Sequence, residues 1–417
     1  MKAKRYPLDL SALAYPMMRT KRSESNYRFS AEMKDGVDPR LLTQSLCEVL
    51  PRYPVFRTRV AASFFWHELV ENNAPLLVKE DDRQPLRPLR KEDTNGYPFR
   101  LAYKGEQVVL EVFHAVTDAN VASLFFADIL TRYAEIKEGT RESELPERAL
   151  KVEDAFLLCG KKKKLCELSL KSYNGDSVYA LGKRGKYREY AELLSQELPL
   201  DEVKAAAKAH GVTITEYVAA AYLCAITQGE TLPLKQAVCL FIPIDLRRFF
   251  KTQTMQNFVA FERIFLPKGE SDLSFERVLS IVHEEFTSKI TAQNMQSHVD
   301  DVRRALTLPI VKYTPLFIKQ PLFKLVKCLL NKVRQTAILS NVGRIELPER
   351  AMKYIKNVKF FLNNGKNAPV NLAVNTFGNT LNINVTNGLE ERDIPNRLFA
   401  TLTSQGRKKH STPTIKV

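Results

Sequence analysis

The sequence predicts an α/β protein of two similar domains, each a mixed β-sheet flanked by helices, with a cleft or tunnel between them. At 417 residues the chain is too long for one ordinary domain, so two domains of about 200 residues each are expected. Apolar runs of strand length alternate with runs of helical periodicity, which is the order of an α/β fold. Residues 381–402 also have the same strand, turn and helix order as residues 108–130. A repeat of this size with one candidate site indicates a cleft between two domains.

A change of sequence character predicts the domain boundary. Residues 135–187 are polar, contain glycine and are weakly periodic, as expected of a connection between domains. We place the N-terminal domain at residues 1–150, the interdomain crossover at 151–188 and the C-terminal domain at 189–417.

In the first half, alternating and β-branched runs predict strands at residues 26–33, 56–60, 63–72, 99–103 and 107–113. Asp38 and Pro39 are typical of a helix start, as N-cap and first-turn proline. The helix that they begin carries Leu41, Leu42, Leu46 and Leu50.

The second half is expected to repeat this plan. A strand at 189–200 precedes a helix at 203–209, for which Asp201 is the predicted cap. Thr213 and Glu216 have the spacing of a capping box ahead of an apolar helix. A buried strand at 237–243, an amphipathic helix at 273–290 and a strand end at 336–339 follow.

Basic residues dominate the charge. Lys and Arg outnumber Asp and Glu by 63 to 47, which gives a formal net charge of +16 and favours encounters with anionic partners. They are scattered, apart from Lys161–Lys164 and the tail at Arg407–His410, and no nucleic-acid-binding signature accompanies them. We therefore expect a solvated basic surface and no nucleic-acid partner.

The cysteines and the hydropathy pattern bear on localisation. The six cysteines lack metal-ligand spacing and are expected to be free thiols, as in a reducing cytoplasm: Cys47, Cys159, Cys166, Cys224, Cys239 and Cys328. Pro7, Asp9 and Pro16 interrupt the apolar part of the N-terminus, so it does not resemble a signal peptide. No apolar run approaches the roughly 18 residues of a spanning helix. We predict a cytoplasmic monomer that is soluble or at most peripheral to a membrane, with no metal.

Residues 107–133 form the most informative stretch. A strand at 107–113 meets a helix at 121–133, and His114 and Asp118 lie between them. A histidine at a strand end projects into a crevice, where backbone contacts can fix its tautomer, as a general base requires. From spacing alone, an ordinary capped helix after a buried strand explains most of the pattern.

The sequence FHAVTDA at 113–119 resembles the HHxxxDG motif of the chloramphenicol acetyltransferase-like acyltransferase superfamily, which includes alcohol acetyltransferases and condensation domains of peptide synthetases. His114 matches the second, catalytic histidine of that motif, and Asp118 matches its structural aspartate. Phe113 replaces the first histidine and Ala119 replaces the glycine of a tight turn.

Three further stretches resemble segments of the same superfamily, in the expected order. RYPVFRTRV at 52–60 is similar to the RHxxLRTxF segment of condensation domains. PIDLRRFF at 243–250 with TMQNF at 254–258, and LSNVGRIELPE at 339–349, are similar to segments of bacterial alcohol-acetyltransferase-like proteins.

The resemblance implies roles for individual residues. His114 would be the general base, and Asp118 would form a salt bridge with Arg57. Ser340 or Asn341 would face the oxyanion of the tetrahedral intermediate, where turn chemistry is the alternative explanation. Asn257 would line the acceptor or pantetheine channel. The chain contains no GxSxG nucleophile elbow, and transfer from a thioester requires no covalent enzyme intermediate.

The implied activity is transfer of an acyl group from acyl-CoA, with acetyl-CoA the expected cosubstrate, to a small alcohol or amine, without a permanently bound cofactor. O-acetyl transfer is the expected form. Two alternatives remain: a stand-alone condensation-like domain that uses a carrier-protein thioester, and a non-catalytic binding module of the same fold. The basic surface is compatible with the phosphates of coenzyme A.

Residues 314–333 interleave lysines with large apolar residues. This pattern predicts a helix that covers the cleft, with a peripheral membrane contact as the alternative.

Overall fold

The computed structural model describes residues 3–20, 24–140, 148–161, 178–181, 185–228, 230, 234–329 and 335–407, of which residues 324, 326–329 and 405–407 are described by their backbone only. Half of the predicted crossover, including the lysines of the run after Lys161, lies outside these ranges, as does the tail after Arg407.

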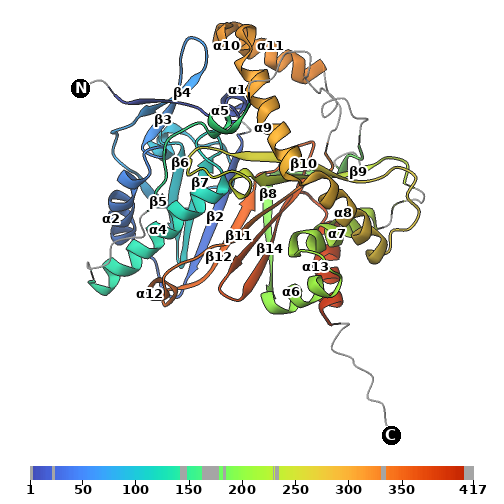
Figure 1. Ribbon diagram of the computed structural model, residues 1–417. Coiled ribbons are helices and arrows are strands. Elements are labelled where there is room, and N and C mark those ends of the chain that lie inside the picture. Colours follow the sequence, from blue (N-terminus) through green and yellow to red (C-terminus); the bar gives the residue numbers. More distant parts are fainter. Residues whose placement is uncertain are drawn as a thin grey trace.

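The first sheet has five strands in the order β12-β2-β7-β6-β5 (Figure 1). They are β12 (Ile355–Leu362), β2 (Asn26–Met33), β7 (Gln107–Phe113), β6 (Phe99–Lys104) and β5 (Val78–Glu80). The pairs are antiparallel except β5 with β6, so the sheet is mixed. Helices α2 (Pro39–Val49) and α4 (Ala119–Glu138) pack against each other beside it. Asp38 caps α2 through the Arg40 and Leu41 amides, as predicted.

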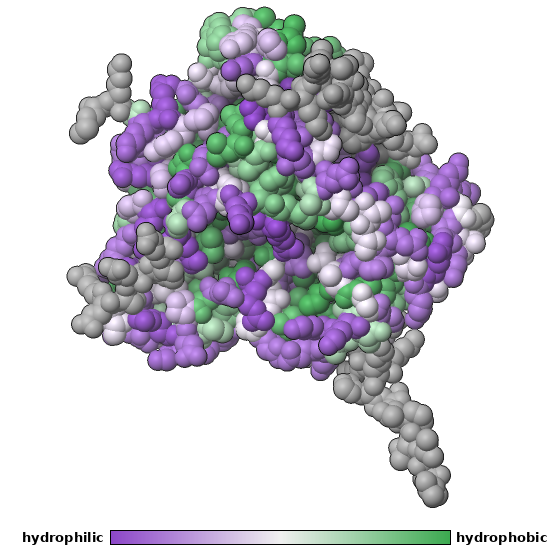
Figure 2. Space-filling model, in the orientation of Figure 1, coloured by the Kyte–Doolittle hydropathy of each residue, from purple (hydrophilic) through white to green (hydrophobic). Residues whose placement is uncertain are grey.

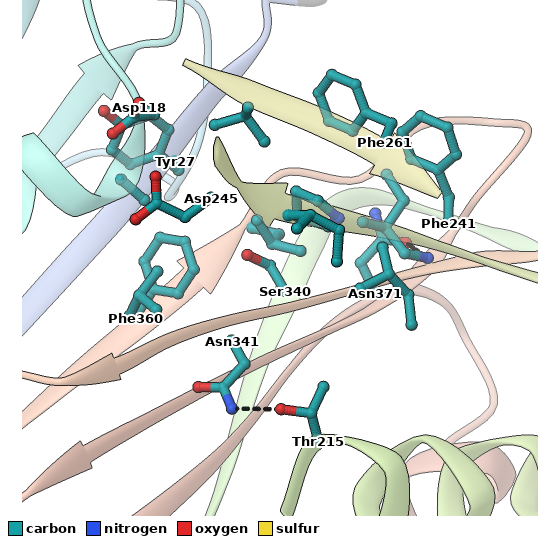
Figure 3. A pocket seen from close by; sticks show the side chains of 18 of the residues that line it. Tyr27, Asp118, Thr215, Phe241, Asp245, Phe261, Ser340, Asn341, Phe360 and Asn371 are labelled. Atoms are coloured by element: carbon teal, nitrogen blue, oxygen red, sulfur yellow. Dashed lines mark hydrogen bonds between the residues drawn. The ribbon is translucent and has the colours of Figure 1, made fainter. Parts of the chain in front are cut away.

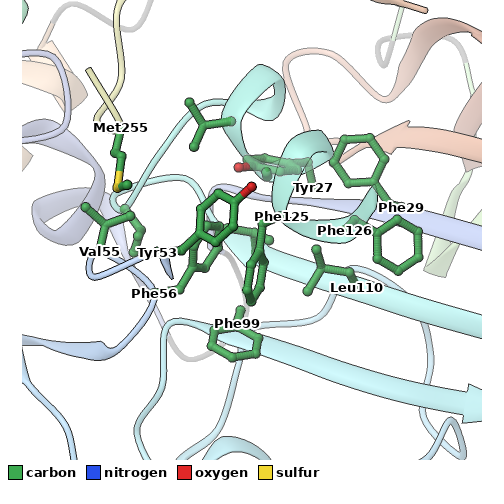
Figure 4. Packing of buried hydrophobic residues seen from close by; sticks show 14 of the residues in the cluster. Tyr27, Phe29, Tyr53, Val55, Phe56, Phe99, Leu110, Phe125, Phe126 and Met255 are labelled. Atoms are coloured by element: carbon green, nitrogen blue, oxygen red, sulfur yellow. The ribbon is translucent and has the colours of Figure 1, made fainter. Parts of the chain in front are cut away.

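Aromatic residues form the core of this half (Figure 4). The Phe125 ring of α4 stacks on Phe56 with ring centroids 4.1 Å apart. The hydroxyl of the buried Tyr53 donates to the Asp128 carboxylate at 2.8 Å, so its polar end is satisfied. Met255 reaches this core from a distant part of the chain.

A small sheet of β1 (Arg5–Pro7), β4 (His67–Glu71) and β3 (Thr58–Ala62) flanks the first half. The strand predicted at 63–72 is shorter in the structure, because Ser63–Trp66 form the turn between β3 and β4. Short helices complete this part: α1 (Ala14–Met18), a 3-10 helix at Leu50–Arg52, α3 (Lys91–Thr94) and α5 (Ala155–Cys159).

The second sheet has six strands in the order β10-β9-β11-β13-β14-β8. They are β10 (Val259–Leu266), β9 (Val238–Asp245), β11 (Ala337–Arg344), β13 (Val370–Phe377), β14 (Thr380–Leu389) and β8 (Tyr187–Pro199). Four helices pack with it around a second apolar core: α6 (Leu200–Ala209), α7 (Ile214–Thr227), α8 (Phe275–Lys289) and α13 (Asp393–Arg407). The capping box of Thr213 and Glu216 is present at the start of α7.

Three sequence-based expectations need correction. Asp201 does not cap α6, because the helix begins one residue earlier, at Leu200, and Asp201 lies in its first turn. Ser340 and Asn341 lie within β11 and not at its end, since the strand continues to Arg344 through an irregularity. Residues 355–362, which we assigned to the C-terminal domain, form β12 of the first sheet.

The free edge of β12 is satisfied by side chains and not by a further strand. Asn375 of β13 accepts from the Phe360 amide at 3.1 Å and donates to the Val358 carbonyl at 2.7 Å. Asn382 also donates to that carbonyl, and Thr386 donates to the Leu362 carbonyl. A buried strand edge needs such partners, so these side chains join the two sheets.

The β9–β10 connection also joins the two halves. It contains a 3-10 helix at Leu246–Arg248 and then runs to Phe258. Leu246, Met255 and Phe258 are buried in the core of the first half, although β9 and β10 belong to the second sheet. We call residues 246–258 the clasp.

The remaining helices are α9 (Ala292–Thr307), α10 (Pro309–Tyr313), α11 (Leu316–Leu329) and α12 (Glu349–Met352). Within the described ranges no single helix has the length and apolarity to cross a membrane, and only the pair α6 and α7, bent by 86°, meets that test jointly.

We expect Asn375→Ala to lower the free energy of unfolding by about 3 kcal/mol, because it leaves the buried Phe360 amide and Val358 carbonyl short of partners. Urea unfolding measures this. Asn379→Ala, at an exposed turn position of the same hairpin, is the matched control and should change stability by less than about 0.5 kcal/mol. Equal effects of the two substitutions would contradict a role for Asn375 in joining the sheets.

Candidate functional site

A cavity of about 1760 Å³ lies between the two halves and is lined by residues of both. One end contains Tyr27 and Asp118, and Phe241 and Phe261 lie toward the other (Figure 3). His114 and Ser340 both line it, so the structure brings these two predicted residues to one space.

His114 is held from several directions. It follows β7, and its backbone amide donates to the Ser25 carbonyl at 2.8 Å. Its ring stacks on Tyr15 at a centroid distance of 4.7 Å and meets Tyr27 edge-on at 5.1 Å. The Tyr27 hydroxyl donates to the Thr117 carbonyl, which fixes that ring in turn. The imidazole therefore has one defined orientation.

Hydrogen bonds select the tautomer of His114. Its Nδ1 lies 2.9 Å from Oδ1 of Asn257, and Nδ2 of Asn257 donates to Oδ2 of Asp9 at 3.0 Å. A carboxylate only accepts, so the amide nitrogen must face Asp9 and the amide oxygen must face the imidazole. Nδ1 of His114 then carries the proton. Nε2 keeps its lone pair, as a general base needs.

Asp9 is buried and held by donors. The Ser11 hydroxyl and the Ala12 amide donate to Oδ1, and the Asn257 backbone amide donates to Oδ2. Burial raises the pKa of Asp9 to about 7, against these hydrogen bonds. The groups that hydrogen-bond to Asp9 donate to it and favour the ionised carboxylate, whereas burial and the nearby charge of Asp154 oppose ionisation.

Burial lowers the pKa of His114 below its ordinary value of 6.5, while the charge of Asp118 and the hydrogen bond that His114 donates to Asn257 oppose the shift. A buried imidazole is costly to charge, so the neutral form prevails near neutral pH. This is the form that accepts a proton.

Asp118 has a structural position. It caps α4 by accepting from the Val121 amide, and Oδ2 accepts from the Phe258 amide at 3.0 Å and from Nη1 of Arg247 at 2.8 Å. Arg247 also donates to the Thr254 and Gln256 carbonyls. The ion pair therefore joins the turn after His114 to the clasp.

The predicted pairing of Asp118 with Arg57 is wrong. Arg57 donates to the side chain of Asn73 at 2.7 Å and is exposed, outside the residues that line the cavity. Arg247, in the segment PIDLRRFF, occupies the place that we expected for Arg57.

Asn257 also differs from its expected role. It is buried behind His114 and outside the cavity lining, with its amide used by His114 and Asp9. It therefore orients the imidazole and does not line a substrate channel.

Ser340 and Asn341 have different partners. The Asn341 amide is occupied, because Nδ2 donates to Thr215 at 2.9 Å and Oδ1 accepts from the Gly343 amide (Figure 3). Ser340 lines the cavity, and within the described part of the chain its hydroxyl has no hydrogen-bond partner. Of the two side chains, that of Asn341 is fixed by hydrogen bonds and that of Ser340 is not.

Sequence reasoning missed Asp9, Tyr15, Tyr27 and the site role of Arg247. The first three lie at least 87 positions from His114 in the sequence, and no spacing links them to it. An aspartate in an apolar N-terminal segment was the one available signal for Asp9. We used it only as a break in hydropathy.

The far part of the cavity carries further polar groups. His283 hydrogen-bonds to the Glu216 carboxylate at 2.8 Å, and Lys204 and Lys208 of α6 also line the cavity. Across the described residues, no group of three His, Cys, Asp or Glu side chains is arranged to hold a metal.

No family model and no curated protein matches the sequence. Solved structures match over nearly its whole length. The match to the first condensation domain of the CDA synthetase covers 98% of this chain and 98% of that domain, with a TM-score of 0.66 and 13% identity. The chain has the condensation-domain fold.

Two further structures are similar. The match to polyketide synthase associated protein 5 from Mycobacterium tuberculosis covers 96% of this chain and 98% of that protein, with a TM-score of 0.64 and 15% identity. The third is a mutant starter condensation domain of rhizomide synthetase, solved with C8-CoA and Leu-SNAC. The match covers 96% of this chain and 94% of that domain, with a TM-score of 0.62 and 12% identity. These matches confirm the predicted chloramphenicol acetyltransferase-like fold, which condensation domains share.

In this condensation-domain fold, Asp118→Asn should cost about 3 kcal/mol of stability, since it removes the nearer and more deeply buried of the two carboxylates that pair with Arg247 and leaves only Asp245, at 3.1 Å. Combined with Arg247→Met, the loss should be less than additive by about 1 to 3 kcal/mol in urea unfolding. The matched cycle of Asp118→Asn with Arg57→Met should be additive. Coupling in the second cycle, or additivity in the first, would show that the pairing is misassigned.

Proposed function

We propose that the protein is an acyl-CoA-dependent acyltransferase that transfers an acyl group to an alcohol or amine, with His114 as the general base. The observation that carries the proposal is the chain of Asp9, Asn257 and His114, which leaves Nε2 of a neutral imidazole free at a large cavity. Removing the acceptor's proton as it attacks a thioester is the task of such a base.

The proposed reaction has two steps. The acceptor oxygen or nitrogen attacks the thioester carbonyl while Nε2 of His114 takes its proton. The tetrahedral intermediate then collapses, the carbon–sulfur bond breaks, and the proton passes from His114 to the departing thiolate. The products are the acyl ester or amide and coenzyme A.

Ser340 is proposed to stabilise the oxyanion of the intermediate. Its hydroxyl is a free donor in a buried strand, and such a preorganised donor stabilises developing charge more than it stabilises the ground state. The Asn341 side chain is held in place by Thr215 and by the Gly343 amide. We therefore assign the oxyanion to Ser340, whose hydroxyl is not held by a hydrogen bond among the described residues, and give Asn341 a structural role.

The cavity favours an apolar acyl chain or acceptor. Phe241, Phe249, Phe261 and Phe286 line it, and their rings offer no strong hydrogen-bond partners. Lys204 and Lys208 provide positive charge near the cavity, which suits the phosphates of coenzyme A. A solved neighbour that contains C8-CoA supports an acyl-CoA donor.

The second candidate is transfer from a carrier-protein thioester, because several of the similar structures are condensation domains of synthetases. The two donors are told apart by measuring thiol release from acetyl-CoA and octanoyl-CoA against an acylated carrier protein, each with a panel of alcohols and amines. Release from the CoA thioesters that depends on the acceptor supports the proposal. Thiol release only from the acylated carrier protein would support the second candidate, with the same mechanism.

We expect His114→Ala to reduce turnover by roughly 10²- to 10⁴-fold with acyl-CoA binding unchanged. Ser340→Ala should cost up to about 10³-fold, also without loss of binding, because its hydroxyl acts only once charge develops. Steady-state kinetics and calorimetric binding of CoA measure both. His210→Ala, an exposed histidine outside the cavity, is the control and should retain full activity.

The pH profile separates the two variants. The base must be neutral, and its pKa lies below 6.5, so the wild-type rate should fall only as the pH drops through that lowered value. Ser340→Ala should keep this acid limb, whereas the residual rate of His114→Ala should lack it. Full transfer by His114→Ala would overturn the proposed mechanism.

Asn257→Leu should reduce turnover by about 10- to 100-fold with little change in KM, because Nδ1 loses its acceptor and the tautomer with the proton on Nε2 becomes populated. Nitrogen-15 NMR of the His114 ring reports the tautomer directly. Asn341→Leu is a control that removes the amide of a half-buried residue in the cavity lining and should leave the tautomer unchanged. An unchanged nitrogen-15 spectrum of His114 in Asn257→Leu would show that Asn257 does not set the tautomer.

A further inference from the structure

The large exposed apolar side chains are gathered on one end of the molecule. Eight of the eleven among the described residues belong to the β3–β4 turn and helices α10 and α11, with Ile310 78% and Phe317 70% exposed. Figure 2 shows the hydrophobic colour at the top of this face, where Figure 1 places α10 and α11. We call this surface the apical patch: Phe64, Phe65, Ile310, Tyr313, Phe317, Ile318, Leu322 and Leu325.

Hydrogen bonds and a cation–π contact hold the segments of the apical patch together. The Leu316 amide of α11 donates to the Phe64 carbonyl at 2.8 Å, and Nζ of Lys319 donates to the Phe65 carbonyl at 2.9 Å. The Lys319 amine also lies 3.0 Å from the centre of the Trp66 ring. These contacts fix the β3–β4 turn to α11 while the patch side chains stay exposed to solvent.

The predicted cleft-covering role does not account for the exposure. The described residues of 314–329 are absent from the lining of the cavity. Exposed apolar patches of this kind mark surfaces that another partner covers.

The basic character of the segment that carries the patch favours one partner. Residues 302–334 contain eight Lys and Arg and no Asp or Glu in the sequence, and among the side chains that the structure describes Lys312 is exposed and lies over the ring of the patch residue Tyr313. Exposed large apolar side chains in a segment with basic and no acidic residues are the pattern of interfacial membrane binding. Anionic lipid head groups complement the basic residues, and the acyl boundary accepts the Phe, Ile and Leu side chains.

We propose that the apical patch docks the protein on a membrane surface that contains anionic lipid. Helix α11 packs against α1, and Ala14, Tyr15 and Met18 of α1 line the cavity. The docked surface is thus linked through one short helix to the space that holds His114. Binding to the membrane is independent of the proposed acyl transfer, so either can fail without the other.

The test is sedimentation of the full chain with vesicles of phosphatidylcholine and phosphatidylglycerol at 3:1, compared with pure phosphatidylcholine. We expect binding to the mixed vesicles, weaker binding to pure phosphatidylcholine and a loss in high salt, since the lipid charge is then screened. The triple variant Ile310→Ser, Phe317→Ser, Leu322→Ser should bind at least about tenfold more weakly. These side chains are exposed, so folding is retained, which circular dichroism verifies.

Two further variants sharpen the result. Lys312→Glu, at an exposed position of α10, should weaken binding to the anionic vesicles without affecting the weak binding to pure phosphatidylcholine. Tyr187→Ser replaces an exposed aromatic residue outside the patch and should bind as wild type does. Equal binding by the triple variant, or no binding to either vesicle, overturns the proposal. A dimer in vesicle-free solution that the triple variant abolishes would assign the patch to a second copy of the chain instead.

Discussion

The ion pair between Asp118 and Arg247 holds the geometry of the candidate site. Asp118 is buried at the start of α4, and Arg247 belongs to the clasp between two strands of the other sheet. Because a buried carboxylate without its partner is strongly unfavourable, the pair fixes how the clasp lies against the first half. The same clasp carries Asn257, whose amide oxygen faces His114. One electrostatic contact thus helps to set the position of Asn257, which orients the imidazole, although the imidazole itself hydrogen-bonds to Asn257 and not to Asp118 or Arg247.

The two sheets depend on a second constraint, the unpaired edge of β12. This strand follows β11 in the chain but pairs with β2 of the first sheet, so it crosses between the halves. Its other edge points at β13 and β14, where Asn375, Asn382 and Thr386 supply the missing donors and acceptors. Side chains that satisfy a strand edge require a defined separation of the sheets, because hydrogen bonds tolerate little change in length. The cavity between the halves therefore has a fixed width at this side, which suits a site that must hold two reactants in one geometry.

Local signals explain how much of this the sequence could predict. The strands at 26–33 and 107–113 and the caps by Asp38, Asp118 and Thr213 follow from residues within a few positions of one another, and the structure has them as predicted. The superfamily motifs also pointed to the correct fold. The errors concern contacts between distant segments. Arg57 and Arg247 were both arginines in motif-like stretches, and nothing local distinguishes the one that reaches Asp118. The resemblance placed Asn257 in a channel, and no local signal shows that its partner is Asp9, which lies 248 positions away.

Burial explains why the site needs so many supporting residues. The pKa of His114 is lowered by its removal from water, which keeps the base neutral but also removes the water that would otherwise satisfy Nδ1. Asn257 replaces that water, and an amide can turn over to present either a donor or an acceptor. Asp9 settles this choice, since a carboxylate with the amides of Ala12 and Asn257 around it accepts and does not donate. A buried neutral imidazole is thus oriented, through Asn257, by a carboxyl group two hydrogen bonds away, and the N-terminal segment that carries Asp9 belongs to the site as much as the strand that leads to His114 does.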